Sequence, residues 1–327
     1  MGVAFTADRG DAGVRVDLAV LRHLPPSRVR SRTRVQRLVA GGAIEVNGRV
    51  VRRASTRLAP GDHVLVAWPD AHARQAPVPQ AIRLAVLFED EWLIAVNKPP
   101  GLIVHPSYKH PDHTLINALV WHARMADPAS EAPRLLHRLD KWTSGVVVAA
   151  RSGSSYGPLL TAMRAADAEK AYLAVTYRGP RRRTGAIRFA LGRDAHDRRR
   201  VVASTGDGRE SLTRYECVAR TAGARRGLSL LQCRLVTGRM HQIRVHLSAS
   251  GWPIVGDPFY GSRGWERIRD PHLAEVTRQF PRQALHAWRV RFTHPFTGER
   301  LSIVAGVPDD LGALLDAGGF DPRLTDA

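Results

Sequence analysis

One short string, LLHRLDKWTSGVVVAA from Leu135 to Ala150, contains side chains that could do chemistry. It places Asp140 in a turn between two apolar runs, with Arg138 two residues earlier. The β-branched VVVAA that follows is typical of a buried strand. A lone aspartate in such a turn usually shapes or caps the turn, so spacing alone leaves both a structural and a catalytic carboxylate open.

The same string suggests two hydrolytic chemistries, and its spacing argues against both. A glycosidase needs a pair of carboxylates, and no second Asp or Glu stands close to Asp140 in the sequence. A serine hydrolase could use Ser144 with His137, but Ser144 lacks the G-x-S-x-G elbow that presents a nucleophilic serine. This hydrolase stays a disfavoured alternative, which predicts reactivity with an acyl-serine trap.

The composition favours a nucleic-acid partner. The chain of 327 residues has 49 Lys and Arg against 30 Asp and Glu, a formal net charge of +19. Cations that neutralise phosphates release condensed counterions, so an excess this large points to a polyanion. With 44% hydrophobic residues, the chain is long enough for two or three globular domains.

Other classes of protein are disfavoured by what the sequence lacks. Cys217 and Cys233 have no thiol or histidine at metal-ligand spacing, which predicts two buried thiols and no metal site. The N-terminal MGVAFTADRGDAG does not resemble a signal peptide, and no apolar run is long enough to cross a bilayer. We therefore expect a soluble, cytoplasmic protein with no membrane partner.

A break in the apolar periodicity divides the chain. The stretch PDAHARQAPVPQ, residues 69–80, is rich in Pro, Ala and Gln and is interpreted as a linker. It separates a compact segment, residues 14–68, from a larger one, residues 81–310, in which strand-like and helical runs alternate. Residues 311–327 are predicted to form a poorly ordered C-terminal tail.

The first segment contains a basic helix followed by a hairpin. In SRVRSRTRVQRLVA, residues 27–40, the apolar residues face inward and the arginines cover the exposed side. These arginines are Arg28, Arg30, Arg32, Arg34 and Arg37. Gly41 and Gly42 are expected to end the helix. In IEVNGRVV, Asn47 and Gly48 suit the left-handed positions of a tight turn.

From R-V-D-L through this helix to V-N-G and G-D-H-V, the segment resembles the small RNA-binding domain named after small-subunit ribosomal protein S-four. The match covers nearly all of the segment, and the order and spacing of its motifs make it specific. The resemblance implies a small α/β S-four-type domain that binds structured RNA through the basic helix and the turn after it. It therefore assigns the five arginines to RNA binding.

The second segment resembles the RluA-type pseudouridine synthases. The string H-R-L-D-x-x-T-S-G around Asp140 looks like the signature of that family, and VLFEDEWLIAVNKPPGLIVHPS, residues 86–107, resembles its first motif. EKAYLAV, residues 169–175, resembles the strand with the active-site tyrosine, and LVTGRMHQIRVHL with GDPFYG resembles the third motif. The match covers roughly residues 81–261. It implies an α+β fold with a long mixed and antiparallel sheet and an RNA cleft across it.

The resemblance also implies a role for each residue of the site. Asp140 would be the essential carboxylate, acting on the ribose as a nucleophile or as a base. Tyr172 would stack on the uracil, and its hydroxyl is a candidate for moving the C5 proton, although a phenol with a pKa of ~10 is a poor base. Arg138 would fill the space that a flipped uridine leaves. Leu247 is expected, like Arg138, to take part in base flipping or substrate contact. Trp142 departs from the family pattern, where a small or polar residue is more usual, and could narrow the range of substrates.

Arg244 is predicted to lie close to Asp140. If residues 239–250 form a helix, Arg244 falls at the edge of its inward face. The apolar stripe of that helix would comprise Met240, Ile243 and Leu247. A buried arginine is costly unless it is paired, and the resemblance implies the partner, an ion pair with Asp140. Guanidinium can grip a carboxylate with two parallel hydrogen bonds.

The sequence therefore predicts an RNA pseudouridine synthase that uses no metal and no organic cofactor, because the isomerisation is redox-neutral and needs no activated donor. The expected target is large-subunit ribosomal RNA, where RluA-type enzymes with an S-four-type domain mostly act, and transfer RNA is the runner-up. No obligate protein partner is inferred. The rival from another class is a non-catalytic RNA-binding ribosome-assembly factor, against which the joint presence of Asp140, Tyr172 and Arg244 argues.

Overall fold

The structure, a computed structural model, describes residues 2–24, 31–67, 77–106, 110–194, 197, 200–204, 208–221 and 227–321. The chain divides between Ala76 and Pro77 into two compact units. Each unit has a hydrophobic core that draws only on its own residues. Within the described ranges, no helix is long and apolar enough to cross a membrane.

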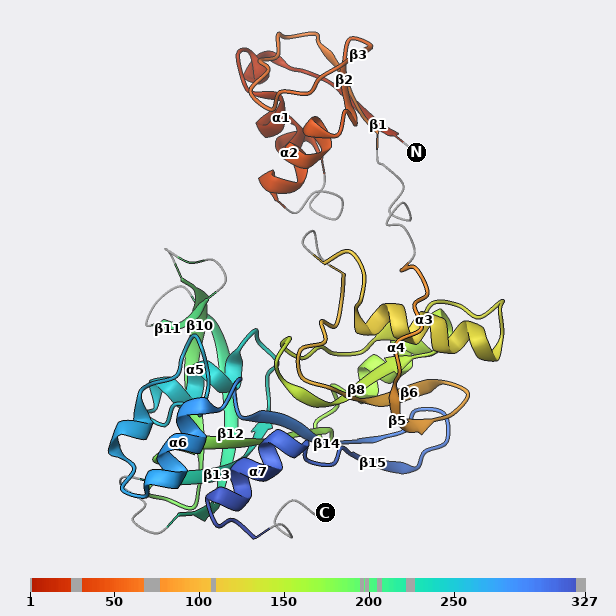
Figure 1. The fold of residues 1–327 in the computed structure, drawn as a ribbon. Helices are drawn as coiled ribbons and strands as arrows, with labels where there is room; N and C mark the ends of the chain where they lie inside the picture. Colours follow the sequence, from red (N-terminus) through yellow and green to blue (C-terminus); the bar gives the residue numbers. More distant parts are fainter. Residues whose placement is uncertain are drawn as a thin grey trace. The chain divides into compact units, whose positions relative to one another are not determined.

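The N-terminal unit is a four-stranded antiparallel sheet that shares its core with two helices (Figure 1). The strand order is β1-β4-β2-β3. The elements are β1 (Gly2–Thr6), the 3-10 helix η1 (Arg9–Asp11), α1 (Val16–His23), α2 (Arg32–Ala40), β2 (Ile44–Val46), β3 (Arg49–Val50) and β4 (His63–Ala67). Because β1 pairs along the whole of β4, this unit begins well before residue 14, the boundary expected from the sequence.

Helix α2 is the basic helix expected from the sequence, although its first residue is Arg32 rather than a residue near position 27. The hydroxyl of Ser31 caps it by accepting a hydrogen bond from the backbone amide of Arg34 at 3.4 Å. Its buried side chains are those of Val35, Leu38 and Val39. Arg28 and Arg30 lie outside the described residues.

Glycine follows the end of this helix, and an Asn-Gly pair forms the turn of the hairpin after it, as expected. Gly42 follows the helix with a φ of +73°. Asn47 and Gly48 then have φ values of +52° and +75°, which is the turn that matches the twist of a two-stranded hairpin. The exposed basic helix and the hairpin of β2 and β3 are therefore adjacent in sequence, as the S-four-type resemblance implied.

The C-terminal unit is an α+β fold built on one mixed sheet, which confirms the expected fold class. Within the described residues the strands follow the order β11-β10-β12-β13-β9-β14-β8-β6-β5, with β15 beside β14 and β7 beside β8. The strands are β5 (Ala85–Glu89), β6 (Leu93–Lys98), β7 (Arg134–Leu135), β8 (Ser144–Ala150), β9 (Glu169–Tyr177), β10 (Thr184–Arg193), β11 (Val201–Ser204), β12 (Arg209–Arg220), β13 (Leu228–Leu235), β14 (Leu285–Thr293) and β15 (Arg300–Val304). The helices are α3 (Leu115–Ala126), α4 (Gly153–Ala162), α5 (Gln242–Ala249), η2 (Gly264–Arg267), α6 (Pro271–Gln279) and α7 (Asp309–Ala317). Cys217 on β12 and Cys233 on β13 are free and buried, as predicted.

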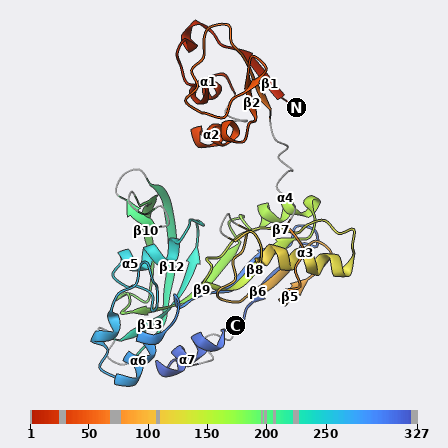
Figure 2. The ribbon, with the colours of Figure 1, turned by 45° about the horizontal axis from the view of Figure 1, so that its top comes forward.

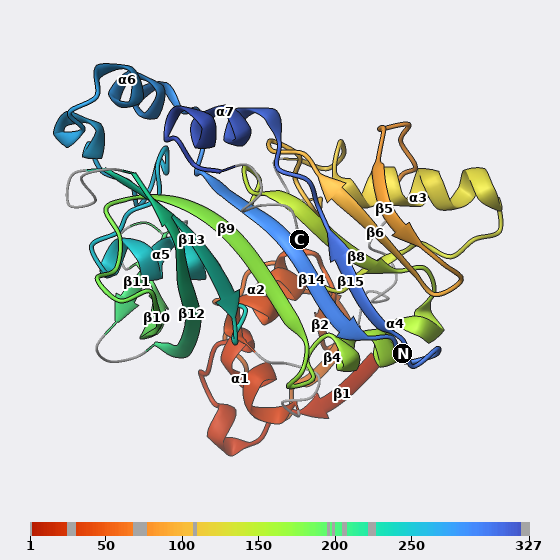
Figure 3. The same ribbon diagram turned by 90° about the horizontal axis from the view of Figure 1, so that it is seen from below.

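Strands β9 and β14 run side by side through the middle of the sheet and join its two halves (Figure 3). One half contains β10 to β13 with α5 against them, and the other contains β5, β6 and β8 with α3 and α4 beside them (Figures 1 and 2). The turn with Asp140 leads into β8, whereas Arg244 lies on α5. A site that uses both residues therefore draws on both halves of the sheet.

Gly145 of the T-S-G string is required by the close approach of β8 to β14. It stands opposite Ala287 in the parallel pairing of these strands. Its φ is +114°, and a Cβ at this position would lie 2.1 Å from the carbonyl oxygen of Ala287. Only glycine allows such an approach. The glycine thus fixes where the chain enters β8, and with it the turn that carries Asp140.

Two further domain boundaries predicted from the sequence are wrong. The segment expected to be a poorly ordered tail, residues 311–327, begins inside α7, whose buried residues are Leu311, Leu314 and Leu315. These leucines belong to the main core, so the C-terminal unit extends through this helix. The predicted linker also ends too late, because Asn117 on α3 donates to the carbonyl of Val78 at 2.8 Å and its own carbonyl accepts from Gln80 at 3.2 Å. Residues 77–80 are part of the C-terminal unit.

Candidate active site

A buried lysine holds the turn that carries Asp140. The side chain of Lys98, at the end of β6, is fully buried. Its ammonium donates to the carbonyls of Pro99 at 2.7 Å, Leu102 at 3.0 Å and Lys141 at 3.0 Å. Burial lowers the pKa of Lys98 to about 7, and the three carbonyls satisfy all three N–H groups of its charged form. The backbone directly after Asp140 is thereby fixed to β6.

An arginine and a glutamine hold the same turn through two further hydrogen bonds. Arg282 Nη1 donates to the carbonyl of Trp142 at 3.2 Å, and the amide of Gln283 donates to the hydroxyl of Thr143 at 3.1 Å. Arg282 is itself gripped by Asp310 of α7 through two hydrogen bonds of 2.6 and 2.8 Å. The C-terminal helix therefore supports the turn through Arg282.

Arg244 and Asp140 form the ion pair that was expected. Arg244 Nη1 donates to Asp140 Oδ2 at 2.8 Å. The side chain of Arg244 is 4% exposed and that of Asp140 is 23% exposed, so the cation lies behind a carboxylate that remains open to solvent. Within the described residues, Oδ1 of Asp140 accepts no hydrogen bond. One oxygen of the carboxylate is thus anchored, and the other accepts nothing from the part of the chain that the structure describes.

Asp257 holds Arg244 from behind, and sequence analysis did not assign this residue a role. Arg244 Nε and Nη2 donate to the two oxygens of Asp257 at 2.7 and 2.8 Å, so the bidentate pairing that guanidinium can make is with Asp257, while Asp140 receives one hydrogen bond. Asp257 also accepts from the backbone amides of Phe259 at 2.9 Å and Tyr260 at 3.0 Å. The signal that could have found it is the string GDPFYG, in which an aspartate precedes a Pro-containing turn.

Two carboxylates keep Arg244 charged in its buried position. Burial alone would lower the pKa of Arg244, but the hydrogen bonds and negative charge of Asp257, together with Asp140, raise it above its ordinary value. The guanidinium also lies over the rings of Tyr260, at 5.1 Å, and Phe259, at 5.8 Å. The site therefore contains a permanent positive charge whose position is fixed by two acids and two aromatic rings.

Helix α5 is shorter and more deeply buried than predicted. It begins at Gln242, and Met240, expected in its apolar stripe, precedes it and is 42% exposed. Ile243 and Leu247 are buried as expected, but Arg244 is also buried rather than at an edge. Leu247 has no exposed surface and belongs to the main core, which argues against the direct substrate contact assigned to it.

Tyr172 on β9 is buried, and its phenol is not suited to act as a base. Burial raises the pKa of Tyr172, and the negative charge of Asp140 raises it further. The phenol therefore stays protonated near neutral pH, which disfavours the hydroxyl as the group that removes the C5 proton. The electrostatic effect also places Tyr172 in the neighbourhood of Asp140.

Arg138 is exposed, whereas the three residues expected at the chemistry, Asp140, Tyr172 and Arg244, are buried or half-buried. Arg138 contributes to the electrostatics of the site, because its positive charge acts on His241. An exposed arginine near the carboxylate is compatible with a side chain that moves when a nucleotide enters. Trp142, the departure from the family pattern, is 45% exposed beside Gly101.

The serine hydrolase considered from the sequence is contradicted by the structure. The Nε2 atom of His137 accepts a hydrogen bond from the backbone amide of Val148 at 3.1 Å. Burial lowers the pKa of His137 to about 3. Ser144 instead bonds to His286 Nδ1 at 3.0 Å, and both residues are buried in the core. A serine with this partner and burial has no access to a substrate.

In the N-terminal unit, one described arginine of the basic helix is tied to the fold by a buried acid. Arg32 Nε donates to the buried carboxylate of Asp17 at 3.0 Å. Burial alone would raise the pKa of Asp17, but hydrogen bonds from Arg15, Gln36 and Arg32 lower it to about 2. Arg32 is therefore committed to the fold. Arg34 and Arg37, the other two described arginines of this helix, are exposed, as is Arg32.

Among the described residues, one group could offer three ligand atoms to a metal ion, namely Asp8, Asp11 and His23, with these atoms within 4.8 Å of one another. They already have partners within the chain. His23 Nε2 lies 2.7 Å from Asp11 Oδ2, and Arg22 Nη1 donates to Asp11 Oδ1 at 3.2 Å. Asp8 and Asp11 also cap η1, so the group is explained by the local fold.

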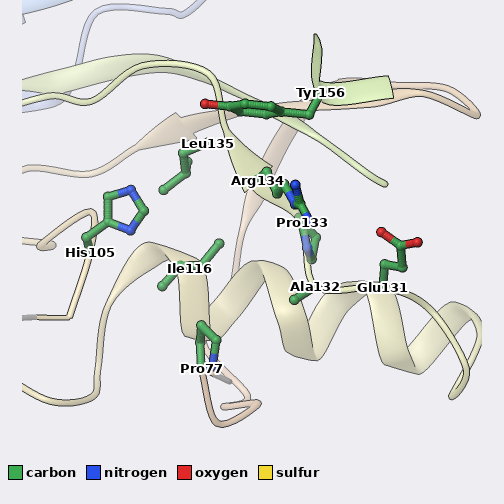
Figure 4. Close-up of a pocket in the computed structure, with 9 residues that line it drawn as sticks. All are labelled: Pro77, His105, Ile116, Glu131, Ala132, Pro133, Arg134, Leu135 and Tyr156. Atoms are coloured by element: carbon green, nitrogen blue, oxygen red, sulfur yellow. The ribbon is translucent and has the colours of Figure 1, made fainter. Parts of the chain in front are cut away.

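The C-terminal unit also has an open cavity of about 660 Å³ beside α3 (Figure 4). It is lined by Pro77, His105, Ile116, Glu131, Ala132, Pro133, Arg134, Leu135 and Tyr156. None of the residues around Asp140 lines it. The geometry of the ion pairs, rather than this cavity, identifies the candidate active site.

Comparison with known protein families first gives the class of protein. The family model described as RNA pseudouridylate synthase matches residues 92–249, a range that includes Asp140, Tyr172 and Arg244. The model of the S4 domain matches residues 28–64 of the N-terminal unit. Both matches point to an enzyme that modifies RNA and has an RNA-binding domain, in agreement with the fold and the site.

Individual relatives extend this match over nearly the whole chain. Ribosomal large subunit pseudouridine synthase D of Xylella fastidiosa is 40% identical, over 98% of this chain and 93% of the relative. An uncharacterized RNA pseudouridine synthase of Synechocystis is 35% identical, over 95% of this chain and 91% of the relative. The solved structure of human RNA pseudouridylate synthase domain containing 1 is 26% identical, covers 73% of this chain and 89% of its own, and superposes with a TM-score of 0.54. The chain belongs to the RNA pseudouridine synthase family, whose members isomerise uridine to pseudouridine.

Proposed function

We propose that this pseudouridine synthase acts in the cytoplasm on uridines of large-subunit ribosomal RNA, with Asp140 as its essential carboxylate. The choice of RNA is supported by the relative from Xylella fastidiosa, whose name states a large-subunit activity and which matches 98% of this chain. The S4 domain and the net charge of +19 are consistent with a large structured RNA. Transfer RNA, the runner-up, has no observation in its favour.

The reaction requires one bond to break and one to form at the same carbon. The glycosidic bond between N1 of uracil and C1′ of the ribose breaks, the base rotates, and C5 bonds to C1′. The hydrogen lost from C5 is balanced by a proton gained at N1, so the product is an isomer of the substrate. The protein must therefore act on the ribose, hold the detached uracil and exclude water, and it supplies no atom or electron.

The assignment of Asp140 rests on one observation: its two carboxylate oxygens differ in their hydrogen-bond partners. Oδ2 accepts from Arg244 at 2.8 Å, while Oδ1 has no partner among the described residues. We propose that Oδ1 acts on the ribose, either by attack at C1′ or by removal of a ribose proton. Arg244 supplies the opposite charge and fixes the direction in which Oδ1 points.

Tyr172 and Arg138 complete the proposed site. The neutral phenol ring of Tyr172 lies close enough to Asp140 to feel its charge, and stacking on the uracil face would hold the detached base during its rotation. Arg138 is exposed, so it can enter the stack from which the uridine is extruded. Because the phenol of Tyr172 stays protonated, we assign removal of the C5 proton to a different group.

The test is complementation of a deletion strain with two variants, each of which removes one negative charge. Asp140→Asn keeps the shape of the side chain and removes its charge, and Asp112→Asn is the matched control on an exposed carboxylate. Pseudouridines are mapped by chemical labelling in ribosomal and transfer RNA. We expect sites in large-subunit RNA to be lost in the deletion strain, restored by wild type and Asp112→Asn, and not restored by Asp140→Asn.

The purified proteins separate chemistry from binding. We expect Asp140→Asn to lose at least about a thousandfold in rate while its RNA affinity stays within about threefold, because the charge acts in the reaction rather than in binding. Turnover within tenfold of wild type would show that Asp140 is not essential. Sites lost from transfer RNA alone would overturn the proposed target, and no lost site at all would favour the ribosome-assembly factor.

A further inference from the structure

His241 lies beside the reactive carboxylate, and the roles proposed above do not use it. It directly precedes α5 with a φ of +55°, a region that residues other than glycine rarely adopt. Its Nε2 is 3.7 Å from Oδ2 of Asp140. Strained backbone of this kind persists only where the surrounding structure enforces it, and it is concentrated at active sites.

The imidazole of His241 is neutral near pH 7. Burial lowers its pKa, and the positive charges of Arg244 and Arg138 act in the same direction, against the negative charges of Asp140 and Asp257. A neutral imidazole has a single N–H group, so its effect on Asp140 depends on which ring nitrogen carries the proton.

The hydrogen bonds around Tyr260 favour one position for that proton. The backbone amide of Val201 donates to the hydroxyl oxygen of Tyr260 at 2.9 Å, and this oxygen lies 2.9 Å from Nδ1 of His241. The amide uses one lone pair of the hydroxyl oxygen, and among the described residues Nδ1 is the one acceptor within hydrogen-bonding distance of the hydroxyl proton, so we assign this proton to Nδ1. When Nδ1 accepts, the proton of the neutral ring is on Nε2, the nitrogen that faces Asp140.

The turn from Asp257 to Tyr260 fixes both neighbours of the anchored oxygen. Asp257 grips Arg244, and Tyr260 orients His241. The turn is held in place because the backbone amide of Tyr260 donates to Asp257 at 3.0 Å and because the tyrosine ring packs in a small buried cluster. That cluster consists of Leu191, Val201, Val245 and Tyr260.

We propose that His241 is a positioning residue whose Nε2–H becomes the second hydrogen-bond donor to Oδ2 of Asp140 when a uridine enters the site. Closing the gap from 3.7 Å to hydrogen-bonding distance requires a shift of less than about 1 Å. With two donors on Oδ2, Oδ1 is the only oxygen left for the ribose. The new hydrogen bond would be stronger once the substrate has displaced water, because the local dielectric constant falls. The inference rests on the proposed role of Asp140.

The test compares variants that keep or remove the donor. His241→Gln retains an N–H near the position of Nε2 and an oxygen that can face Tyr260, whereas His241→Ala removes both. His272→Ala, on the exposed face of α6, is the control. Single-turnover rates are measured with enzyme in excess over total RNA from the deletion strain, so that any target is present, and the half-saturating enzyme concentration reports binding.

We expect His241→Ala to lower the saturating rate at least tenfold with a half-saturating concentration within twofold of wild type. His241→Gln should recover to within about threefold of wild type. A rate for His241→Ala within twofold of wild type, an equal loss in both variants, or a loss confined to binding would each overturn the proposal. A failure of the role of Asp140 itself is seen separately, because Asp140→Asn would then be active.

The pH profile of Tyr260→Phe gives a second readout that a structural role would not move. Loss of the hydroxyl removes the donor to Nδ1, which had favoured the neutral ring, so the pKa of His241 should rise. A protonated ring would place a second full positive charge beside Asp140, and the carboxylate would then be a weaker nucleophile and a weaker base. The acidic limb of the rate profile of Tyr260→Phe should therefore shift to higher pH. This shift should be absent from the double variant with His241→Gln, because glutamine does not titrate. An unchanged acidic limb in a folded Tyr260→Phe protein would contradict the proposed tautomer.

Discussion

At the scale of single residues, the site alternates in charge from the core to its opening. Asp257 is buried and holds Arg244, and Arg244 holds one oxygen of the half-exposed Asp140. A guanidinium paired with one acid through one hydrogen bond could rotate. Two parallel bonds to Asp257 fix its plane, so that the bond to Asp140 has a defined direction. The acid behind the cation therefore matters for geometry as well as for charge.

This arrangement predicts a specific effect of Asp257→Asn. The amide keeps the shape of the side chain but leaves Arg244 with Asp140 as its one full negative partner. Breaking a buried ion pair typically costs 3–5 kcal/mol, and because Asp140 remains we expect about 3 kcal/mol in the unfolding free energy. The rate should also fall, since the direction of Oδ1 is no longer fixed. Thermal unfolding and single-turnover rates measure the two effects.

The matched control for Asp257→Asn is Asp167→Asn. Asp167 pairs with Arg300 at the surface, where both side chains are about half exposed. Exposed pairs contribute at most about 1 kcal/mol, so this variant should unfold and react almost as wild type does. Equal losses of stability in the two variants would show that the buried pair has no special role.

At the scale of elements, three parts of the chain converge on the turn from Asp140 to Thr143. The end of β6 supplies Lys98, the segment before β14 supplies Arg282, and α7 supplies the acid that grips Arg282. The reactive turn is thus not an independent loop. It is a short connection in which the carbonyls of Lys141 and Trp142 accept hydrogen bonds from buried side chains, and this explains how a residue in a turn can be held firmly.

The dependence on α7 can be tested with Asp310→Ala. Without its acid, Arg282 loses two hydrogen bonds and its grip on the carbonyl of Trp142 loosens. A misplacement of about 1 Å can cost a hundredfold in rate, and since Lys98 still holds the turn we expect a loss of about tenfold. Asp316→Ala, an exposed acid on the same helix, is the control and should leave the rate unchanged. A wild-type rate for Asp310→Ala would mean that α7 only fills the core.

How far the sequence predicted these elements depended on whether their signal was local. The hairpin turn at Asn47 and Gly48 and the end of α2 follow from backbone preferences of the residues themselves, and both were predicted correctly. The α+β fold and the pairing of Arg244 with Asp140 came from resemblance, since these residues are 104 positions apart and no periodicity connects them. Asp257 was missed because a buried acid reached by two bonds from a helix leaves no periodic trace.

The error at α7 has a different cause. Leu311, Leu314 and Leu315 stand at the spacing of one helix face, so the helical pattern was present in the sequence. Its brevity, and the glycines and the polar residues that follow it, made the segment resemble a frayed terminus. Tertiary contacts make this segment an ordered helix, because the three leucines pack in the main core and Asp310 accepts a hydrogen bond from Arg282.

At the scale of the whole molecule, the N-terminal unit carries more net positive charge per residue than the rest of the chain. Residues 1–76 carry 13 arginines and no lysine against 6 Asp and Glu, which is a net charge of +7 out of the +19 of the whole chain. This unit has its own sheet and core, and the carboxylate, its ion pairs and the scaffold of the turn all lie beyond Pro77. Binding and chemistry are therefore expected to separate along the chain.

Removal of residues 1–76 tests that separation. Because no core residue is shared between the units, the remaining chain should keep the unfolding temperature of the C-terminal unit and the saturating rate on a short RNA. Its affinity for long RNA and the salt dependence of that affinity should both fall, since phosphate contacts of the basic helix are lost. Unchanged affinity and salt slope would show that the N-terminal unit does not bind the RNA.

The share of the basic helix can be isolated in the full chain by comparing two double variants of equal charge. Arg34→Ala with Arg37→Ala removes two exposed arginines of α2 and spares Arg32, which Asp17 holds in the fold. Arg267→Ala with Arg269→Ala removes two exposed arginines of the C-terminal unit. If Arg34 and Arg37 each contact a phosphate, the slope of log K against log salt should fall by about 1.4 to 1.8 in the first variant. It should change little in the second, while the saturating rate stays at the wild-type value in both. Equal changes of slope would mean that RNA responds to the total charge of the protein rather than to this helix.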